Sequence, residues 1–458
     1  MIDIYDLVVI GGGTAGLVSA HLAAMLGARV VMVEREAHPG GDCLWTGCVP
    51  SKALLAAAEL AQRMRAAGDV GLTPVEPEID FARVMDHVRG ARTAIAPHDS
   101  AERLRAAGAE VVRGEAAFAG EDTVVVGART LRFRRAIVAT GSRPAARAGA
   151  LTSDTVWDLE ELPARLLVIG GGAVGCELAQ AFARLGSAVA LCEAAPRLLP
   201  GEDERASALL EARLRDEGVE VRTSASDPDQ TGFDRVLVAA GRVPDTAALG
   251  LRRAGVRTGT DGAVIADARL RTSNPRVFAA GDVVASAPHF THVAAHHARV
   301  ATPNALFGAR TKVETAAVPR VTYTDPEVAA VGLSAAAARS RWGERARIVD
   351  ADYGELDRAI TAGVPYGFAR LVGDPRGRLV GATVAAPGAG ESIAELTAWL
   401  SQGASIAKVS QTIHAYPTFA EGPSRAADEY LRERFARTRA RPALRVLFTV
   451  RRTLSAAR

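Results

Sequence analysis

Two cysteines, Cys43 and Cys48, are separated by four residues in the segment GGDCLWTGCVPSK at positions 40–52. Such a pair can ligate a metal, form a structural disulfide or cycle between dithiol and disulfide. A structural zinc site needs four ligands, and no second Cys/His pair has a spacing that would complete one. The adjacent His296 and His297 are expected to be surface or packing residues of a helix. We therefore expect no metal site.

The spacing of the pair restricts the backbone between the two cysteines. Five residues of regular α-helix rise about 7.5 Å, whereas the α-carbons of a disulfide lie about 4.4–6.8 Å apart. The segment must therefore leave regular helix, which Gly47 permits. The run after Pro50, SKALLAAAEL, predicts a helix whose N-terminal dipole favours a thiolate at Cys48. These features indicate a redox-active pair.

An internal repeat predicts the elements that position this pair. Residues 7–34, LVVIGGGTAGLVSAHLAAMLGARVVMVE, and residues 166–193, LLVIGGGAVGCELAQAFARLGSAVALCE, are identical at 13 of 28 positions when aligned without a gap. Each copy reads as an apolar strand, a GxGxxG turn, a helix and a second strand that ends in an acid, which is the dinucleotide-binding βαβ unit. Cys176 and Cys192 lie in the second copy and are expected to be buried as small apolar residues.

Each glycine of the repeated turn has a physical role. The first permits the tight turn, the second lets backbone amides approach a pyrophosphate, and the third lets the helix pack on the strand. These residues are Gly11, Gly13 and Gly16 in the first copy and Gly170, Gly172 and Gly175 in the second. Glu34 and Glu193 end the second strands, where a carboxylate accepts hydrogen bonds from a ribose 2′-hydroxyl.

Two dinucleotide sites in one chain predict a flavin and a nicotinamide arranged for hydride transfer. The carboxylate of Glu193 would repel a 2′-phosphate, so the sequence favours NADH. Arg197 is close enough in sequence to leave NADPH open.

Composition restricts the class of protein. At 458 residues, with 48% apolar and 23% charged residues, the chain is long enough for two to four packed domains. The N-terminal MIDIYDLVVIGGG carries acids where a signal peptide carries positive charge, and no apolar run reaches transmembrane length, so we expect a cytoplasmic protein.

The net charge of +3 is concentrated at the C-terminus. Residues 431–458 contain nine arginines and one glutamate, so the rest of the chain is mildly acidic, which argues against nucleic-acid binding. This basic tail is expected to be a solvated extension. The alternatives are an interfacial helix on anionic lipid and a partner-binding segment.

The segment GGDCLWTGCVPSK resembles the active-site motif of the FAD-dependent class I pyridine nucleotide–disulfide oxidoreductases, the family of dihydrolipoamide dehydrogenase, glutathione reductase and mercuric reductase. The resemblance extends from residue 3 to about residue 430. The other matching motifs are ATGSRP at 139–144, AAGRVP at 239–244, VFAAGDV at 277–283 and VPRVTYTDPEVAAVGLS at 318–334.

The resemblance implies roles for individual residues. Cys43 corresponds to the interchange thiol that attacks the substrate, and Cys48 to the thiol that contacts the flavin. Lys52 is expected near flavin N5, paired with Glu177, and Asp282 is expected at the ribityl chain. The other implied FAD contacts are Gly41, Ala116, Thr140 and Gly141, and Gly241 is implied at the NAD site.

The chain departs from the family near its C-terminus. Disulfide reductases usually carry HxHPxxxE there, in which the Glu holds the second His as an acid–base group. Here the segment is His414-Ala415-Tyr416-Pro417 with Glu421 in register, and Tyr416 takes the place of the second His. A phenol has a pKa near 10, against about 6.5 for imidazole, so at neutral pH it seldom accepts a proton. Fast oxidation of a dithiol such as dihydrolipoamide is therefore not expected.

Four further departures concern the cysteines and the NAD region. Asp42 is expected either to raise the pKa of the Cys43 thiol or to cap a helical turn, and Trp45-Thr46 replaces the Asn-Val of dihydrolipoamide dehydrogenase. No cysteine follows Cys192, so the C-terminal pair that mercuric reductase relies on is missing, although reduction of a metal ion at Cys43 and Cys48 stays open. The stretch 218–235 is short, which predicts a trimmed β-meander. Asp42, Trp45-Thr46 and Tyr416 together resemble the mercuric-reductase-like branch of the family, which carries a similar motif and a Tyr in the C-terminal site.

We therefore expect an α/β protein with two Rossmann-like domains, for FAD (1–147 and 268–317) and NAD(P) (148–267), an α+β dimerisation domain (318–430) and the tail 431–458. The resemblance implies a homodimeric FAD-dependent reductase that passes electrons from NADH through the cysteine pair to a disulfide or other small acceptor. The alternatives are a dihydrolipoyl dehydrogenase, a metal-ion or quinone reductase, and a redox-responsive binding module.

Overall fold

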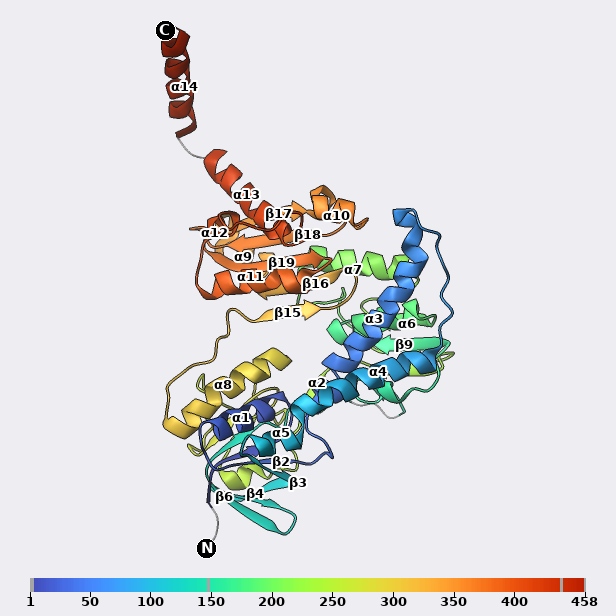
Figure 1. Cartoon of the computed structure of the whole chain (residues 1–458), viewed down its shortest axis with the longest axis vertical. Coiled ribbons are helices and arrows are strands. Elements are labelled where there is room, and N and C mark those ends of the chain that lie inside the picture. The colour runs from blue at the N-terminus through green and yellow to red at the C-terminus, as the bar shows by residue number, and fades with distance from the viewer. Residues whose placement is uncertain (1–3, 146–148, 437–439, 457–458) are drawn as a thin grey trace. The chain divides into compact units, whose positions relative to one another are not determined.

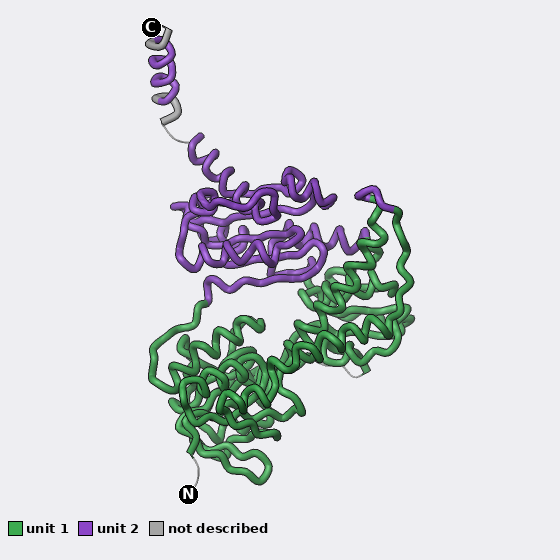
Figure 2. The backbone as a smooth tube through the Cα atoms, viewed as in Figure 1, with its two compact units in different colours: residues 1–68, 73–195, 217–314 green, residues 69–72, 196–216, 315–458 purple. Residues whose placement is uncertain are grey.

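The computed structural model describes residues 4–145, 149–436 and 440–456, and Figure 1 shows its elements. The chain divides into two compact units, coloured separately in Figure 2. Unit 1 comprises residues 1–68, 73–195 and 217–314, and unit 2 comprises residues 69–72, 196–216 and 315–458. Unit 1 contains both Rossmann-like sheets, so this division does not test the predicted boundary between the FAD and NAD(P) domains.

The first sheet of unit 1 has seven strands in the order β3-β2-β1-β6-β5-β4, with β14 also paired to β6. The pairs from β3 to β6 and the β6–β14 pair are parallel, whereas β4, β5 and β6 form an antiparallel meander. The strands are β1 (Ile4–Ile10), β2 (Val30–Glu34), β3 (Glu110–Arg113), β4 (Ala116–Gly120), β5 (Thr123–Val126), β6 (Arg129–Val138) and β14 (Val277–Ala279). Residues 7–9 of β1 are fully buried, as expected for a parallel strand covered on both faces.

The helices of unit 1 follow the glycine turns and carry Cys43, Cys48 and Cys176. The helix α1 follows the first glycine turn and packs against α8, while α3 packs against α4 and α6. The bounds are α1 (Thr14–Met25), α2 (Gly41–Trp45), α3 (Cys48–Arg65), α4 (Phe81–Ile95), α5 (Ala101–Ala106), α6 (Ala173–Arg184) and α8 (Thr291–Phe307). The short 3₁₀ helices are η1 (Ala66–Val70), η2 (Ala96–Asp99), η3 (Val156–Asp158) and η4 (Leu251–Ala254).

The second sheet of unit 1 is entirely parallel, in the order β11-β10-β9-β12-β8. Its strands are β8 (Leu151–Thr152), β9 (Arg165–Ile169), β10 (Ala188–Cys192), β11 (Glu220–Arg222) and β12 (Arg235–Val238). Residues 223–234 between β11 and β12 contain no strand, so the predicted loss of the meander is confirmed for this stretch. Cys176 and Cys192 are buried, also as predicted.

A short antiparallel ribbon connects the two sheets. It pairs β7 (Ser142–Pro144), which follows β6 of the first sheet, with β13 (Arg242–Pro244), which follows β12 of the second. The chain therefore passes through this ribbon once on its way to the second sheet and again on its way back.

Unit 2 is built on an antiparallel sheet in the order β15-β16-β19-β18-β17, with α11 packed on β16 and β19 and α13 packed on β17 and β18. The strands are β15 (Pro319–Thr322), β16 (Glu327–Gly332), β17 (Arg347–Asp352), β18 (Phe368–Gly373) and β19 (Leu379–Ala386). The helices are α7 (Glu204–Asp216), α9 (Ala335–Trp342), η5 (Gly343–Arg345), η6 (Tyr353–Glu355), α10 (Asp357–Thr361), α11 (Ala389–Ser401), α12 (Ile406–Ser410), α13 (Glu421–Ala436) and α14 (Ala440–Ala456).

The basic tail includes the end of α13 and all of α14. The described residues of α14 expose both arginines and apolar side chains, including Phe448 and Val450. Within the part of the chain that the structure describes, every helix is too short or too polar to cross a membrane. The expected solvated extension, and the alternatives of contact with lipid or a partner, are untested by these observations.

Candidate active site

The backbone between the two cysteines is bent as the sequence predicts. The helix α2 ends at Trp45, residues 46 and 47 are not helical, and α3 begins at Cys48 itself, two residues before Pro50. Proline is tolerated there because the amides of the first helical turn have no partner within the helix. A Cβ on Gly47 would lie 2.9 Å from the carbonyl oxygen of Asp42, so this close approach of the backbone requires glycine.

The two thiols, both free in the structure, have opposite protonation preferences. The hydrogen bond from Cys43 is the main factor that lowers the pKa of Cys48 to about 6, against the effect of burial, and Thr291 and Lys52 lower it further. The same hydrogen bond, together with burial, raises the pKa of Cys43. At neutral pH the reduced pair is therefore a Cys48 thiolate and a Cys43 thiol.

Thr291, the first residue of α8, was not predicted as a site residue. Its Oγ1 lies 3.2 Å from Cys48 Sγ, and its hydrogen bond lowers the pKa of Cys48. A threonine inside the segment HFTHVA carries no sequence pattern that indicates a role beside a thiolate.

Replacing Thr291 by valine is expected to raise the pKa of Cys48, because the thiolate loses a donor while the volume of the side chain is kept. The measurement is the pH dependence of alkylation in a Cys43→Ser background, where the remaining cysteines, Cys176 and Cys192, are buried. The matched control is Thr46→Val, the same substitution at the threonine in the turn between Cys43 and Cys48. An unchanged alkylation profile in the Thr291 variant would show that the hydroxyl does not stabilise the thiolate.

Lys52 and Glu177 form the predicted ion pair. Lys52 Nζ on α3 lies 2.8 Å from the carboxylate of Glu177 on α6, and Glu177 is 4% exposed. The lysine charge lowers the pKa of Cys48, whereas the Glu177 charge opposes that effect. The pair therefore holds a cation within reach of the thiolate.

Asp42 pairs with Arg242, a contact outside its two expected roles of raising the pKa of Cys43 and capping a helical turn. The guanidinium of Arg242 on β13 donates to the Asp42 carboxylate, and it also donates to Ser142 Oγ at 2.7 Å and to the Ser142 carbonyl at 2.8 Å. Burial raises the pKa of Asp42, and Arg242 opposes that shift. The raised pKa of Cys43 has its main causes in Cys48 and burial. Asp42 is thus an anchoring point for the β7–β13 ribbon.

The turn between α2 and α3 is held by donors from distant segments. Arg92 Nη1 donates to the Trp45 carbonyl at 3.0 Å, and the buried indole of Trp157 donates to the Thr46 carbonyl at 2.8 Å. The Trp45 indole itself donates to the Pro39 carbonyl at 2.9 Å and lies beside His38. These contacts fix the non-helical turn that brings Cys43 toward Cys48.

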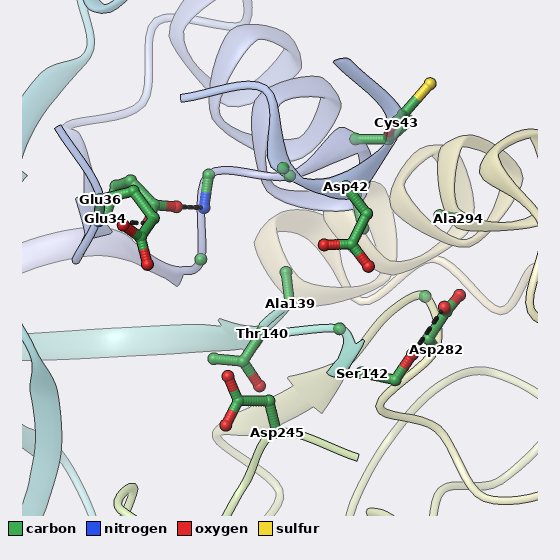
Figure 3. A pocket seen from close by; sticks show the side chains of 18 of the residues that line it. Glu34, Glu36, Asp42, Cys43, Ala139, Thr140, Ser142, Asp245, Asp282 and Ala294 are labelled. Carbon is green, nitrogen blue, oxygen red and sulfur yellow. Dashed lines mark hydrogen bonds between the residues drawn. The ribbon is translucent and has the colours of Figure 1, made fainter. Parts of the chain in front are cut away.

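A cavity of about 660 Å³ in unit 1 adjoins the cysteine pair, and Figure 3 shows part of its lining. Of the predicted FAD residues, those that line it are Gly11, Gly13, Glu34, Gly41, Ala116, Thr140, Gly141 and Asp282, together with both cysteines. Gly16 and Lys52 are not part of the lining. Asp282 accepts a hydrogen bond from Ser142 Oγ at 3.0 Å, which orients its carboxylate.

The cavity fits a dinucleotide on two observations. First, Thr140 Oγ1 is buried without a hydrogen-bond partner among the described residues, so the cavity offers an unused polar atom. Second, a Cβ on Gly13 would meet nothing closer than 3.8 Å, whereas a Cβ on Gly11 would lie 2.4 Å from the Ala139 carbonyl oxygen. Gly11 is required by the fold, but the space beside Gly13 is open for a pyrophosphate.

The second glycine turn repeats this arrangement. A Cβ on Gly170 would lie 2.8 Å from the backbone of Ala239, while one on Gly172 would meet nothing within 4 Å. Glu193 accepts hydrogen bonds from the amides of Gly171 at 2.6 Å and Ala195 at 2.7 Å, just as Glu34 accepts from Gly12 and Glu36. Each acid is thus oriented at the end of its strand.

The remaining predicted residues of the NAD region occupy less specific positions. Gly241 has φ +80° and its carbonyl accepts from the amide of Ala145. The guanidinium of Arg197 donates to the carbonyls of Leu199 and Pro200 and to Ser207 Oγ. Its two terminal nitrogens are therefore engaged by residues 199–207 of unit 2.

The predicted C-terminal residues lie in unit 2 and have separate partners. Tyr416 Oη donates to Asp357 Oδ2 at 2.6 Å, His414 Nε2 lies 2.8 Å from Glu395 Oε2, and Glu421 accepts from the Thr418 amide at 3.2 Å. The residue in direct contact with Tyr416 is thus Asp357, an acid outside the HxHPxxxE pattern. Within the described ranges, no three His, Cys, Asp or Glu side chains gather in a group that could hold a metal ion.

The chain belongs to the pyridine nucleotide-disulphide oxidoreductases. The model of that family matches residues 5–298, and the model of the family's dimerisation domain matches residues 318–427. The predicted fold class is confirmed. The protein is therefore a flavin-dependent oxidoreductase that uses FAD and NAD(P)H.

Three relatives show the range of activities in this family. The chain is 38% identical over 453 residues to a dihydrolipoyl dehydrogenase of Thermus scotoductus, covering 93% of this chain and 97% of that protein. It is 37% identical to a mercuric reductase of Streptomyces lividans, covering 93% and 96%. The HOCl-induced flavoprotein disulfide reductase RclA of Escherichia coli superposes with a TM-score of 0.82 at 26% identity, covering 93% of this chain and 99% of that one.

Proposed function

We propose that this protein is an NADH-dependent reductase in which Cys43 and Cys48 pass electrons to a disulfide or another small acceptor. The observation that carries the proposal is the asymmetric thiol pair, with the pKa of Cys48 at about 6 and that of Cys43 raised, beside a cavity that fits a dinucleotide. When bound there, FAD supplies two-electron exchange between a hydride donor and the dithiol.

The residues of the chain divide the work. Lys52 and the Thr291 hydroxyl stabilise the Cys48 thiolate, and the turn held by Arg92 and Trp157 presents Cys43. Once deprotonated, Cys43 attacks a substrate disulfide, which breaks the S–S bond, releases one thiolate and leaves a mixed disulfide. The Cys48 thiolate then attacks Cys43 Sγ, which forms the Cys43–Cys48 disulfide and releases the second thiolate.

The preference for NADH rests on two groups. The Glu193 carboxylate is held by two backbone amides where a ribose 2′-hydroxyl would bind, and the donors of Arg197 are engaged by Leu199, Pro200 and Ser207. A 2′-phosphate would meet the negative charge of Glu193, and Arg197 would have to give up these hydrogen bonds to pair with it.

Anaerobic titration of the purified yellow protein is expected to show stoichiometric flavin reduction by NADH at a lower concentration than by NADPH. The reduced protein is then offered a panel of disulfides, quinones and metal ions. The Gly172→Ala variant is titrated beside the unaltered protein. Its added methyl group meets no protein atom within 4 Å but enters the space of the nicotinamide nucleotide. A protein that binds no flavin, or whose flavin neither nucleotide reduces, would refute the proposal.

A metal-ion reductase is the second candidate. The 37% identity to a mercuric reductase favours it, but the chain has no cysteine after Cys192 to hand a metal ion inward.

A homodimer is supported by the dimerisation domain and by the 98% exposure of Ile413 and 68% exposure of Tyr416 in the isolated chain. Sedimentation equilibrium gives the mass of the assembly in solution and so tests the homodimer.

A further inference from the structure

A second cavity, of about 470 Å³, lies in unit 2 and shares no lining residue with the cavity beside the cysteines. Its lining comes from α9, the start of β17, the turn between β18 and β19 and the last turns of α13, elements that pack together in unit 2 (Figure 1). This volume suits a small molecule. The charged residues of the lining are Arg339, Arg347, Arg376, Arg434, Glu344 and Glu433.

The four arginines of this cavity differ from other arginines of unit 2 in their partners. Arg320 on β15 pairs with Glu202, and Arg370 on β18 pairs with both Asp203 and Asp350. In contrast, none of the four guanidiniums at the cavity forms a hydrogen bond or an ion pair within the described part of the chain. Four like charges around one cavity repel one another, so the site favours an anion.

The backbone fixes the positions of these arginines. The Arg376 amide donates to Asp374 Oδ1 at 2.8 Å, which holds the turn between β18 and β19, and Arg347 is the first residue of β17. Arg339 and Arg434 lie in the last turns of α9 and α13, where a cation also stabilises the helix dipole. The dipole accounts for two of the arginines, but not for the convergence of four from separate segments.

Tyr430 adds a neutral donor to the lining. Its side chain on α13 is 8% exposed, and a Cβ on Gly377 would collide with its Oη, so the phenol packs against bare backbone of the β18–β19 turn. Among the described residues its hydroxyl has no hydrogen-bond partner. A mostly buried hydroxyl without a partner costs free energy, and an acceptor oxygen of a ligand would satisfy it.

We propose that this cavity binds a small soluble phosphorylated ligand, held by the Tyr430 hydroxyl and the four arginines. Guanidinium groups present paired donors that match phosphate oxygens. Four arginines and two glutamates give the lining a net charge of +2, which balances a phosphate monoester with a charge of about −1.5 to −2. The site is separate from the cysteine pair, so the proposal does not depend on the proposed function.

The first test is calorimetric titration of the FAD-loaded protein with inorganic phosphate, pyrophosphate and glycerol 3-phosphate. Saturating NAD⁺ is present so that the second glycine turn does not bind the probes. We expect one probe per chain, bound at least about tenfold more weakly by the double variant Arg376→Gln/Arg434→Gln and about threefold more weakly by Tyr430→Phe. Flavin content checks that each variant folds.

The matched control is Arg341→Gln, which removes one arginine charge from the same helix as Arg339. Arg341 is not part of the lining, and its guanidinium lies over the Trp342 ring, 5.0 Å from the ring centroid. Its affinity for the probes should be unchanged. The proposal is overturned if no probe binds, or if the control loses as much affinity as the double variant.

The second test separates a soluble ligand from a lipid headgroup with the same phosphate chemistry. Cosedimentation is measured with phosphatidylcholine vesicles, with and without phosphatidic acid. We expect the unaltered protein and the double variant to cosediment equally, because the cavity does not take part in vesicle binding. If the double variant lost binding to phosphatidic acid vesicles but kept its affinity for the soluble probes, the arginines would belong to a lipid-binding surface and the proposal would be wrong.

Discussion

Cys43→Ser is expected to lower kcat for disulfide reduction by more than about 1000-fold, because the nucleophile that opens the substrate is gone. Reduction of the flavin by NADH should persist, since Cys48, Lys52 and Glu177 are unchanged. The measurement combines steady-state turnover with a separate anaerobic half-reaction. The two outcomes together separate loss of the nucleophile from loss of the cofactor.

Cys48→Ser provides the paired control for that result. Cys43 can still attack a substrate disulfide, but no thiolate resolves the mixed disulfide, so a covalent adduct of one substrate half per chain should accumulate and be visible in the intact mass. If Cys43→Ser left every acceptor reaction at its original rate, electrons would pass directly from the flavin and the dithiol mechanism would have to be abandoned.

Gly16→Ala and Gly13→Ala are expected to have opposite kinds of effect, although they lie three residues apart. A Cβ on Gly16 would lie 1.8 Å from the Gly11 carbonyl oxygen, so alanine must displace the strand–turn–helix backbone at a cost of about 3 kcal/mol or more. A Cβ on Gly13 meets no protein atom closer than 3.8 Å, and φ −77° at that residue suits alanine.

The expected result is a Gly16 variant with a lowered free energy of unfolding and a Gly13 variant that folds but binds FAD at least about tenfold more weakly, which corresponds to about 1.4 kcal/mol. Denaturant unfolding of the flavin-free proteins and flavin titration measure the two quantities separately. A Gly13 variant with unaltered FAD affinity would show that the pyrophosphate does not bind beside Gly13.

Local patterns in the sequence were sufficient for the elements and for part of the site. The repeated βαβ units, the bend at Gly47 and the burial of Cys176 and Cys192 each depend on residues within a few positions of one another, where backbone geometry and periodicity are decisive. Lys52 and Glu177 are 125 residues apart and came from the family resemblance, not from spacing.

The contacts that the sequence did not indicate join distant segments. Arg242 and Asp42 are 200 residues apart, Trp157 and Thr46 are 111 apart, and Tyr416 and Asp357 are 59 apart. A non-helical turn leaves backbone carbonyls that any nearby donor can satisfy, so its partners depend on tertiary packing. Arg242 does lie in the AAGRVP motif, which was a usable signal, whereas Asp357 lies outside every motif.

The β7–β13 ribbon has a mechanical consequence. Two paired strands that carry the chain between the sheets resist torsion more than a single connection would, and leave bending as the softer motion, as in a hinge. Arg242 lies on this ribbon and holds the carboxylate next to Cys43. Any bending of one nucleotide-binding half against the other therefore pulls on the turn that presents the nucleophile.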